Sequence, residues 1–222
     1  MDFFKRRLEL RSYLKLLGLV DQCCVAPLAK YWTCAPAVVQ WESGAYPTPA
    51  VPQGSVVFAG SFNPPHSGHV EIMRYLSKAF SEVHIVIGVN PNKTYPVSPE
   101  TRRQIVEQAL LSIGATNAKV WIWGDVIFKL AKQLRASCLY RGIRTWQEDG
   151  KAERYLEVQN ICWPMISTCG APMRTYYIQG PPQFDAVSST LLRERLKSGA
   201  SIDDIVPASV ADLVRSAYDG KL

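Results

Sequence analysis

From residue 55 to the C-terminus, apolar runs of strand length alternate with stretches of helical periodicity. Three β-branched or aromatic residues at 56–58 predict a buried strand over 55–59. Apolar residues then recur at helical spacing over about 68–80 and predict a helix. A near-continuous apolar run at 83–89 is typical of a strand inside a parallel sheet.

The same alternation continues to the end of the chain. It predicts further strands near 118–123, at 138–140 and at about 174–178. It also predicts helices that start at 98–100, span 126–135, lie near 151–162, follow a cap at Ser188 or Ser189, and span 202–218 with a break at Pro207. This order of elements predicts an α/β fold with a doubly wound, Rossmann-like, mostly parallel five-stranded sheet. The ligand site of such a sheet lies beyond the carboxyl ends of its strands.

Residues 1–54 have a different pattern and are expected to form an N-terminal extension to a domain at 55–222. Basic residues interleave with Phe and Leu over 2–20, which predicts an amphipathic helix. Residues 42–54 are rich in Gly, Pro and small residues and are typical of a linker. The helix fits a packed helix, a surface-binding helix or a transit peptide, although Asp2 and Glu9 count against the last of these.

Composition narrows the function classes. The chain has 222 residues and 47% hydrophobic content, enough for one sizeable core. The net charge of +6 suits a phosphate or nucleotide ligand. No run of Lys and Arg is longer than Lys5-Arg6-Arg7, which argues against a nucleic-acid ligand. Six cysteines without C-x-x-C spacing indicate free thiols in a reducing compartment, and no apolar run reaches transmembrane length. We therefore expect a cytoplasmic protein, with mitochondrial or other organellar targeting by residues 1–54 as the alternative, and leave open whether it is a homo-oligomer.

Two of the three histidines follow the first predicted strand. Gly60 is expected to end that strand, and a Pro-Pro pair at 64–65 excludes helix across the turn. Ser67 is then expected to cap the next helix. His66 and His69 would share one space with the free N–H groups and the positive dipole end of that helix. This arrangement predicts an anion site, and phosphate is the obvious anion.

The sequence predicts no metal ion held by protein side chains at this turn. No Cys or carboxylate at ligand spacing accompanies the two histidines. The third histidine, His84, falls inside the apolar run at 83–89 and is expected to be structural.

The turn also resembles a known signature. Residues 60–64 (GSFNP) and 66–69 (HSGH) resemble the HxGH nucleotidyltransferase superfamily, whose members transfer a nucleotidyl group from a nucleoside triphosphate to an acceptor phosphate. Four further blocks resemble bacterial-type phosphopantetheine adenylyltransferase: 90–93 (NPNK), 124–127 (GDVI), 141–144 (RGIR) and 187–190 (VSST). Glu153 and Asn160 also match, once a one-residue insertion within 146–150 is allowed.

Three features depart from that family. His66 stands where the family usually has Thr, residues 146–150 replace its acidic-aromatic run, and residues 1–54 have no counterpart. Two alternatives therefore stay open: a nicotinamide or nicotinate mononucleotide adenylyltransferase, and a non-catalytic nucleotide-binding protein. The RGIR block counts against the first, and the intact His66, His69 and Lys93 against the second. Cytidylyltransferases are disfavoured because their RTxGISTT block is absent.

The resemblance implies transfer of the adenylyl group of ATP, accompanied by Mg²⁺, to 4′-phosphopantetheine, which yields dephospho-CoA and pyrophosphate. The implied catalytic residues are His69, His66, Lys93 and Arg144. The implied acceptor ligands are Ser61, Lys93, Ile127, Arg141 and Asn160. The implied ATP ligands are Ser61, Phe62, His69, Gly142, Ile143, Arg144, Glu153, Phe184, Ser188, Ser189 and Thr190.

Overall fold

The computed structural model describes residues 38–39, 54–90, 93–145, 148–149, 153 and 173–222. The chain divides into two compact units, Met1–Pro36 and Ala37–Leu222, and every described residue belongs to the second. The helix predicted over 2–20, most of the predicted linker, the helix near 151–162 and Asn160 lie outside the described residues.

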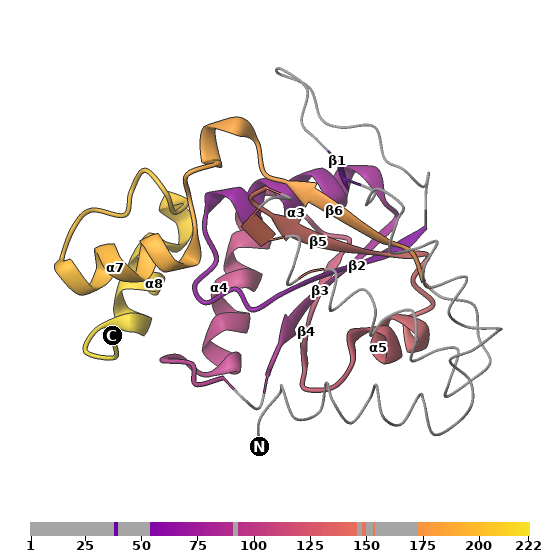
Figure 1. The fold of residues 1–222 in the computed structure, drawn as a ribbon, viewed down its shortest axis with the longest axis horizontal. Coiled ribbons are helices and arrows are strands. Elements are labelled where there is room, and N and C mark those ends of the chain that lie inside the picture. The colour runs from indigo at the N-terminus through magenta and orange to yellow at the C-terminus, as the bar shows by residue number, and fades with distance from the viewer. Residues whose placement is uncertain (1–37, 40–53, 91–92, 146–147, 150–152, 154–172) are drawn as a thin grey trace. The chain divides into compact units, whose positions relative to one another are not determined.

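The second unit is built on a parallel sheet (Figure 1). All five predicted strands are present, and a two-residue strand, β1, adds a sixth, so that the order is β1-β6-β5-β2-β3-β4. Every pairing is parallel. The strands are β1 (Val38–Val39), β2 (Ser55–Gly60), β3 (Glu82–Gly88), β4 (Ala118–Trp123), β5 (Cys138–Ile143) and β6 (Thr175–Gln179).

Helices cover both faces of the sheet, as a doubly wound fold requires. They are α3 (Ser67–Ala79), α4 (Pro99–Ser112), α5 (Ile127–Gln133), α7 (Ser189–Ser198) and α8 (Ala208–Tyr218), with a 3₁₀ turn, η1 (Pro182–Phe184). Apolar residues of α3 and α4 pack on one sheet face, those of α5 pack on the other, and α8 packs against α4. The predicted fold class is therefore confirmed.

Capping side chains fix where several helices begin. Ser98 accepts a hydrogen bond from the Thr101 N–H at the start of α4, and Ser188 accepts one from the Leu191 N–H at the start of α7. The expected cap at Ser67 is wrong, because α3 already begins there and His66 is its N-cap residue. The helix predicted over 126–135 is shorter than expected and ends at Gln133, just before Arg135 takes a left-handed backbone conformation (φ 53°).

Strand β5 is longer than the predicted 138–140. It pairs with β2 only as far as Tyr140, opposite Phe58, but stays paired with β6 as far as Ile143, opposite Gln179. Because β3 and β4 lie on one side of β2 while β5 and β6 lie on the other, the strand order reverses between β2 and β5. The ligand crevice of an open α/β sheet forms at such a reversal.

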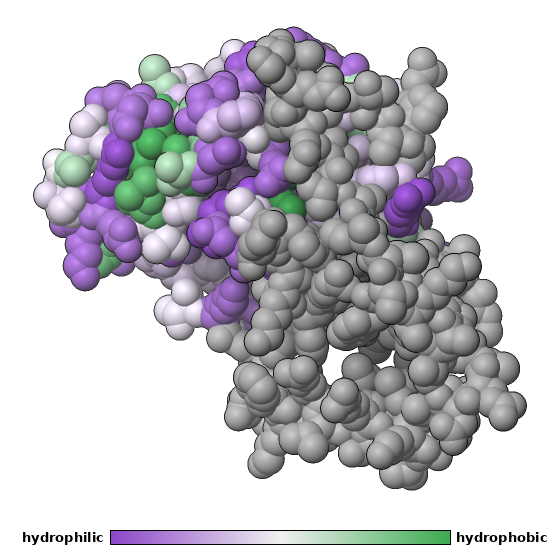
Figure 2. Space-filling view, turned by 45° about the horizontal axis from the view of Figure 1, so that its top comes forward, coloured by the Kyte–Doolittle hydropathy of each residue, from purple (hydrophilic) through white to green (hydrophobic). Residues whose placement is uncertain are grey.

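The described surface gives little sign of an extended apolar face. Figure 2 shows mostly hydrophilic residues on the described part of one face, with hydrophobic residues confined to small patches between them. The large hydrophobic residues that are exposed in the described ranges are Leu111, Leu213 and Leu222. Among the described helices, none has the length and apolar character needed to cross a membrane.

Candidate active site

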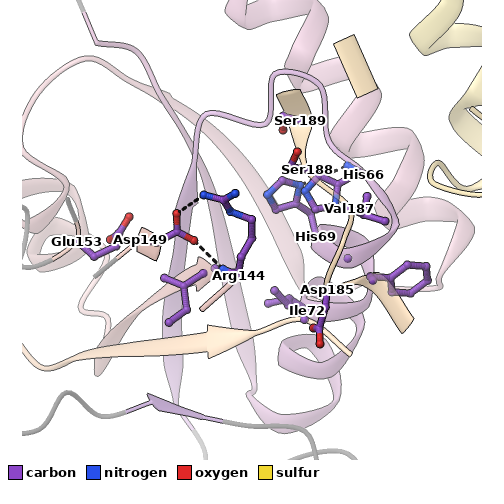
Figure 3. A pocket seen from close by; sticks show the side chains of 15 residues that line it. His66, His69, Ile72, Arg144, Asp149, Glu153, Asp185, Val187, Ser188 and Ser189 are labelled. Atoms are coloured by element: carbon purple, nitrogen blue, oxygen red, sulfur yellow. Dashed lines mark hydrogen bonds and ion pairs between the residues drawn. The ribbon is translucent and has the colours of Figure 1, made fainter. Parts of the chain in front are cut away.

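A cavity of about 210 Å³ opens at the carboxyl ends of β2 and β5, where the strand order reverses (Figure 3). It brings together the two-histidine turn, the end of β5 and the start of α7. Most of the predicted ATP ligands line it. The lining residues are His66, Gly68, His69, Ile72, Gly142, Ile143, Arg144, Asp149, Glu153, Gly180, Phe184, Asp185, Val187, Ser188 and Ser189.

The turn between β2 and α3 is strained and tightly packed. Phe62 has a positive φ of 45°, which is unusual for a bulky residue, and its ring is almost fully buried. That ring meets the rings of Phe58 and His69 edge to face, with centroids 5.5 Å and 5.1 Å away. A Cβ at Gly60 would lie 2.9 Å from the Phe62 ring, so this turn requires glycine there. Backbone strain of this kind is concentrated at functional sites.

The two histidine rings are in contact, with centroids 3.8 Å apart and planes tilted by 36°. The His66 backbone N–H donates to the Nδ1 atom of His69 across 3.3 Å. A Cβ at Gly68 would lie 3.2 Å from the His66 ring, so the close seating of that ring depends on glycine. Burial lowers the pKa of His66 to about 4. Burial, together with His66, lowers the pKa of His69 well below its usual range. Both rings are therefore neutral near pH 7.

Helices α7 and α8 hold the turn from behind. The Ser189 hydroxyl donates to the carbonyl of Pro64 at 2.8 Å, and Nη1 of Arg193 donates to the carbonyl of Asn63 at 2.6 Å. The buried Tyr218 hydroxyl donates to Oδ1 of the same asparagine at 2.6 Å. The C-terminal helices therefore fix the conformation of a turn that lies more than a hundred residues earlier in the chain.

The serine block at the start of α7 offers backbone rather than side-chain donors. The Ser189 hydroxyl donates to the Pro64 carbonyl, and the Ser188 hydroxyl caps the helix. The Thr190 hydroxyl accepts a hydrogen bond from Nη2 of Arg193. The hydroxyl groups are thus engaged within the protein. The first N–H groups of α7 and its positive dipole end remain suited to an anion at the cavity wall.

Arg141 lies inside β5 and pairs with Glu153 through two parallel hydrogen bonds of 2.8 and 2.9 Å. Its third donor bonds the carbonyl of Ala59 on β2 at 3.0 Å. Glu153 lines the cavity, whereas Arg141 is turned toward Glu153 and β2. This arginine ties the diverging ends of β2 and β5 together, and its expected role as an acceptor ligand stays a prediction.

Arg144 lines the cavity and is 47% exposed. Its guanidinium turns toward Asp149, which also accepts from the Arg144 backbone N–H (Figure 3). The two hydrogen bonds measure 2.8 and 2.7 Å, and a looser contact of 3.6 Å reaches Glu148. Arg144 is therefore a partly exposed cation at the cavity wall, held by charge-assisted hydrogen bonds to Asp149.

The remaining predicted ligands lie outside the cavity wall. Ser61 is exposed at the tip of the turn. Lys93 is exposed in the loop after β3, where its N–H bonds the carbonyl of Asn90. Ile127 is half-buried at the start of α5. The roles of Ser61, Lys93 and Ile127 stay predictions.

Sequence reasoning missed three residues that hold the turn: Arg102, Arg193 and Tyr218. Each lies in a helix, 41 to 155 positions from its partner in the turn. No pattern in the sequence points to Arg102 or Arg193 as a partner of the turn, since surface helices commonly carry arginine. Tyr218 ends an apolar helical stripe, so its burial could have been expected, but not its bond to Asn63.

The cavity wall does not supply a protein cage for a metal ion. Two of its three carboxylates, those of Glu153 and Asp149, are committed to arginines. Among the described residues, no group of three or more His, Cys, Asp or Glu side chains is placed to hold a metal.

Comparison with known proteins identifies the family. A family model described as cytidylyltransferase-like matches residues 57–195. A phosphopantetheine adenylyltransferase of Streptococcus pneumoniae is 31% identical over 161 residues, which are 72% of this chain and 94% of that protein. Proteins of the same name from Treponema pallidum and Bifidobacterium longum are 27% and 26% identical, over 96% and 92% of their lengths. The chain therefore belongs to the cytidylyltransferase-like family and groups there with the phosphopantetheine adenylyltransferases.

Proposed function

We propose that this protein transfers the adenylyl group of ATP to 4′-phosphopantetheine and releases pyrophosphate and dephospho-CoA. The observation that carries the proposal is the cavity at the strand reversal, where the two-histidine turn, Arg144 and the start of α7 converge. Relatives named phosphopantetheine adenylyltransferase, matched over nearly their whole length, support the choice of acceptor.

The acceptor phosphate oxygen attacks the α-phosphorus of ATP in line. The bond between the α-phosphorus and the oxygen that bridges the α- and β-phosphates breaks, and pyrophosphate leaves. The acceptor phosphate is already anionic near neutral pH, so no general base is required. Catalysis then depends on holding the two phosphates in line and on stabilising the charge that develops on the transferred group. The protein can supply both through groups that are fixed before the substrates bind.

His69 is the donor that we place on the transferred phosphate. Its Nδ1 atom accepts a hydrogen bond from the His66 N–H, so the proton of the neutral ring sits on Nε2. The Nε2–H group can therefore donate a hydrogen bond to a phosphate oxygen. A neutral donor in a water-excluded site needs no proton transfer to act. His66, which is neutral and in ring contact with His69, assists on the same phosphates.

The other ligands surround this centre. The N–H groups at the start of α7 and the Arg144 guanidinium would hold the β- and γ-phosphates, with Phe184 beside the adenine ring. Lys93 and Ser61 would hold the acceptor phosphate. Mg²⁺ belongs to this scheme as part of the nucleotide substrate.

The test is a side-by-side assay of pyrophosphate release with three acceptors: 4′-phosphopantetheine, nicotinamide mononucleotide and nicotinate mononucleotide. Each is offered with ATP and, separately, with CTP, in the presence of Mg²⁺. We expect turnover with ATP and 4′-phosphopantetheine alone. Turnover confined to a mononucleotide acceptor would replace the proposal with the nicotinamide alternative. ATP binding without turnover of any acceptor would replace it with a non-catalytic role.

The proposal includes a reducing location, the cytoplasm, with organellar import through residues 1–54 as the alternative. It is supported by Cys138, a free thiol whose pKa burial raises to about 12, so that it is inert rather than poised for a disulfide. Fluorescent fusions of the whole chain and of a version lacking residues 1–54 distinguish the two locations.

A further inference from the structure

Arg102 is a fully buried cation next to the turn between β2 and α3. It lies near the start of α4, and its relative exposure is 0%. Its Nη1 donates to the carbonyl of Ser61 at 2.6 Å, and its guanidinium carbon lies 4.3 Å from the centre of the Tyr95 ring. Its Nε donates to the Ser98 carbonyl at 3.4 Å and its Nη2 makes no hydrogen bond, and among the described residues no carboxylate forms an ion pair with it, although the charge of Glu100 acts on it from further away. Burying an arginine with no carboxylate in direct contact carries a large desolvation penalty, so a role in packing alone does not account for it.

The bond from Arg102 determines how the peptide between Ser61 and Phe62 is oriented. This peptide is trans, since the cis bond of the described chain is Asn63-Pro64. In a trans peptide the carbonyl oxygen and the following N–H point in opposite directions. Because the Ser61 oxygen is held toward α4, the Phe62 N–H points away from α4. In the described part of the chain that N–H donates to no protein acceptor.

The rest of the turn leaves this N–H no freedom to rotate. Phe62 is held at a positive φ, and its buried ring is wedged between Phe58 and His69. A cation on the carbonyl oxygen also polarises the peptide and makes its N–H a stronger donor. The result is a fixed donor on the residue whose ring contacts His69, the residue that we place on the transferred phosphate.

We propose that Arg102 is a positioning residue, which holds and polarises the Ser61–Phe62 peptide so that the Phe62 N–H donates to a phosphate oxygen of the bound nucleotide. This inference rests on the proposed function only in taking that anion to be a nucleoside triphosphate. It does not depend on which acceptor receives the nucleotidyl group. Arg102 itself touches neither substrate.

The kinetic test compares Arg102→Met and Arg102→Lys with Arg103→Met. Arg103 is the adjacent residue, is half exposed and pairs only with Glu107 in the described structure, so it controls for losing a cation from α4. Losing an oxyanion donor typically lowers kcat by about 10²–10³-fold. We expect Arg102→Met to lower kcat by about 10–100-fold, with the KM for ATP changed by less than about threefold. Arg102→Lys should recover part of this loss, because an ammonium group can bond the carbonyl but cannot cover the Tyr95 ring.

A spectroscopic test reads the donor itself and needs no acceptor. The chain has seven phenylalanines, so labelling their amides with ¹⁵N gives a short set of signals, and Phe62→Leu identifies the one of interest. Adding MgATP or inorganic pyrophosphate should move the Phe62 amide signal of the wild-type protein strongly downfield. In Arg102→Lys the same ligand should still bind, but the shift should fall to less than about half.

Several outcomes overturn the inference. They are a Phe62 amide that does not move in the wild-type protein, an equal shift in Arg102→Lys, and Arg102 variants that melt at a lower temperature but keep wild-type kcat. If Arg102→Met fails to fold, the kcat of Arg102→Lys and its Phe62 amide shift decide whether the inference stands. Wild-type turnover with a different acceptor would refute the proposed function and leave this inference standing.

Discussion

The His66 N–H donates to Nδ1 of His69, and this contact leaves Nε2 as the only ring nitrogen of His69 that can carry a proton in the neutral form. A backbone group one helical turn away therefore selects the tautomer of the side chain that we propose acts on the transferred phosphate. The orientation is built into the start of α3, before any substrate binds.

Replacing His69 tests that arrangement. We expect His69→Ala to lower kcat by about 10²–10³-fold while ATP still binds, because the donor on the transferred phosphate is lost. His69→Gln, which retains an N–H donor, should recover part of the rate. Steady-state kinetics and calorimetric ATP binding measure both effects. Glu71→Gln is the matched control, since Glu71 lies on the same helix and pairs only with Arg74 in the described structure. Wild-type rates in His69→Ala would contradict the proposed centre.

The lowered pKa of His66 predicts how stability depends on pH. Its pKa is about 4 in the folded protein, against about 6.5 when the chain is unfolded. Below pH 6.5 the unfolded chain therefore binds a proton that the folded protein refuses. The free energy of unfolding should fall as pH drops from 6.5 toward 4, by about 3 kcal/mol from this group, and should be insensitive to it above pH 7.

Urea denaturation at pH 7.5 and 4.5 measures this loss, and His66→Gln should reduce it. The NMR signal of the His66 ring reports its pKa directly. A His66 that titrates near pH 6.5 in the folded protein would show that the ring is not desolvated as the structure indicates.

Arg144→Lys separates catalytic from structural use of a surface arginine. A single ammonium group cannot grip two phosphate oxygens as a planar guanidinium does, so kcat should fall by about tenfold or more. The melting temperature should hardly change, because an exposed ion pair contributes about 0–1 kcal/mol. Arg215→Lys is the control: Arg215 is similarly exposed (42%), and its carboxylate partners are Asp203 and Asp212. Lower stability with unchanged kinetics would assign Arg144 to a structural ion pair.

Glu153 should matter mainly for stability. It is the two-point partner of Arg141, and their side chains are 10% and 24% exposed. Removing one member of a buried pair leaves the other charge uncompensated, which typically costs about 3–5 kcal/mol. We expect Glu153→Gln to lower the free energy of unfolding by about 3 kcal/mol, measured in urea, and Glu148→Gln, on a 54%-exposed glutamate, to change it little. An unchanged stability together with a raised KM for the acceptor would instead make Arg141 a substrate ligand.

Shortened chains test the predicted boundary at residue 54. A chain that starts at Ala37 keeps β1, whereas one that starts at Gly54 loses it and leaves β6 as an open edge strand. We expect both to fold and keep activity, because the interior strands and the cavity lie beyond residue 54. The shorter one should associate at high concentration through its exposed edge, as size-exclusion chromatography would show. An insoluble or inactive Gly54 chain would mean that part of residues 1–54 belongs to the core.

The sequence alone determined the fold class, the order of the five predicted strands along the chain and the position of the two-histidine turn after β2. These follow from local chemistry: β-branched runs favour strands, 3.6-residue periodicity favours helices, and Gly and Pro interrupt both. The caps at Ser98 and Ser188 were readable for the same reason, since a cap bonds a backbone group only a few residues away. Convergence of the two-histidine turn with the end of β5 followed from the rule that parallel strands present their carboxyl ends at one edge.

The tertiary structure decided which polar groups stay available to a ligand. Arg141, the predicted acceptor ligand, is bonded to Glu153, and the serine hydroxyls at the start of α7 bond the helix backbone and the Pro64 carbonyl. Arg102 and Tyr218 were not predicted to contact the turn, because only folding brings them to it from positions 41 and 155 residues away. Pairings of this kind depend on long-range packing of helices against the sheet, and a local sequence pattern contains no record of them.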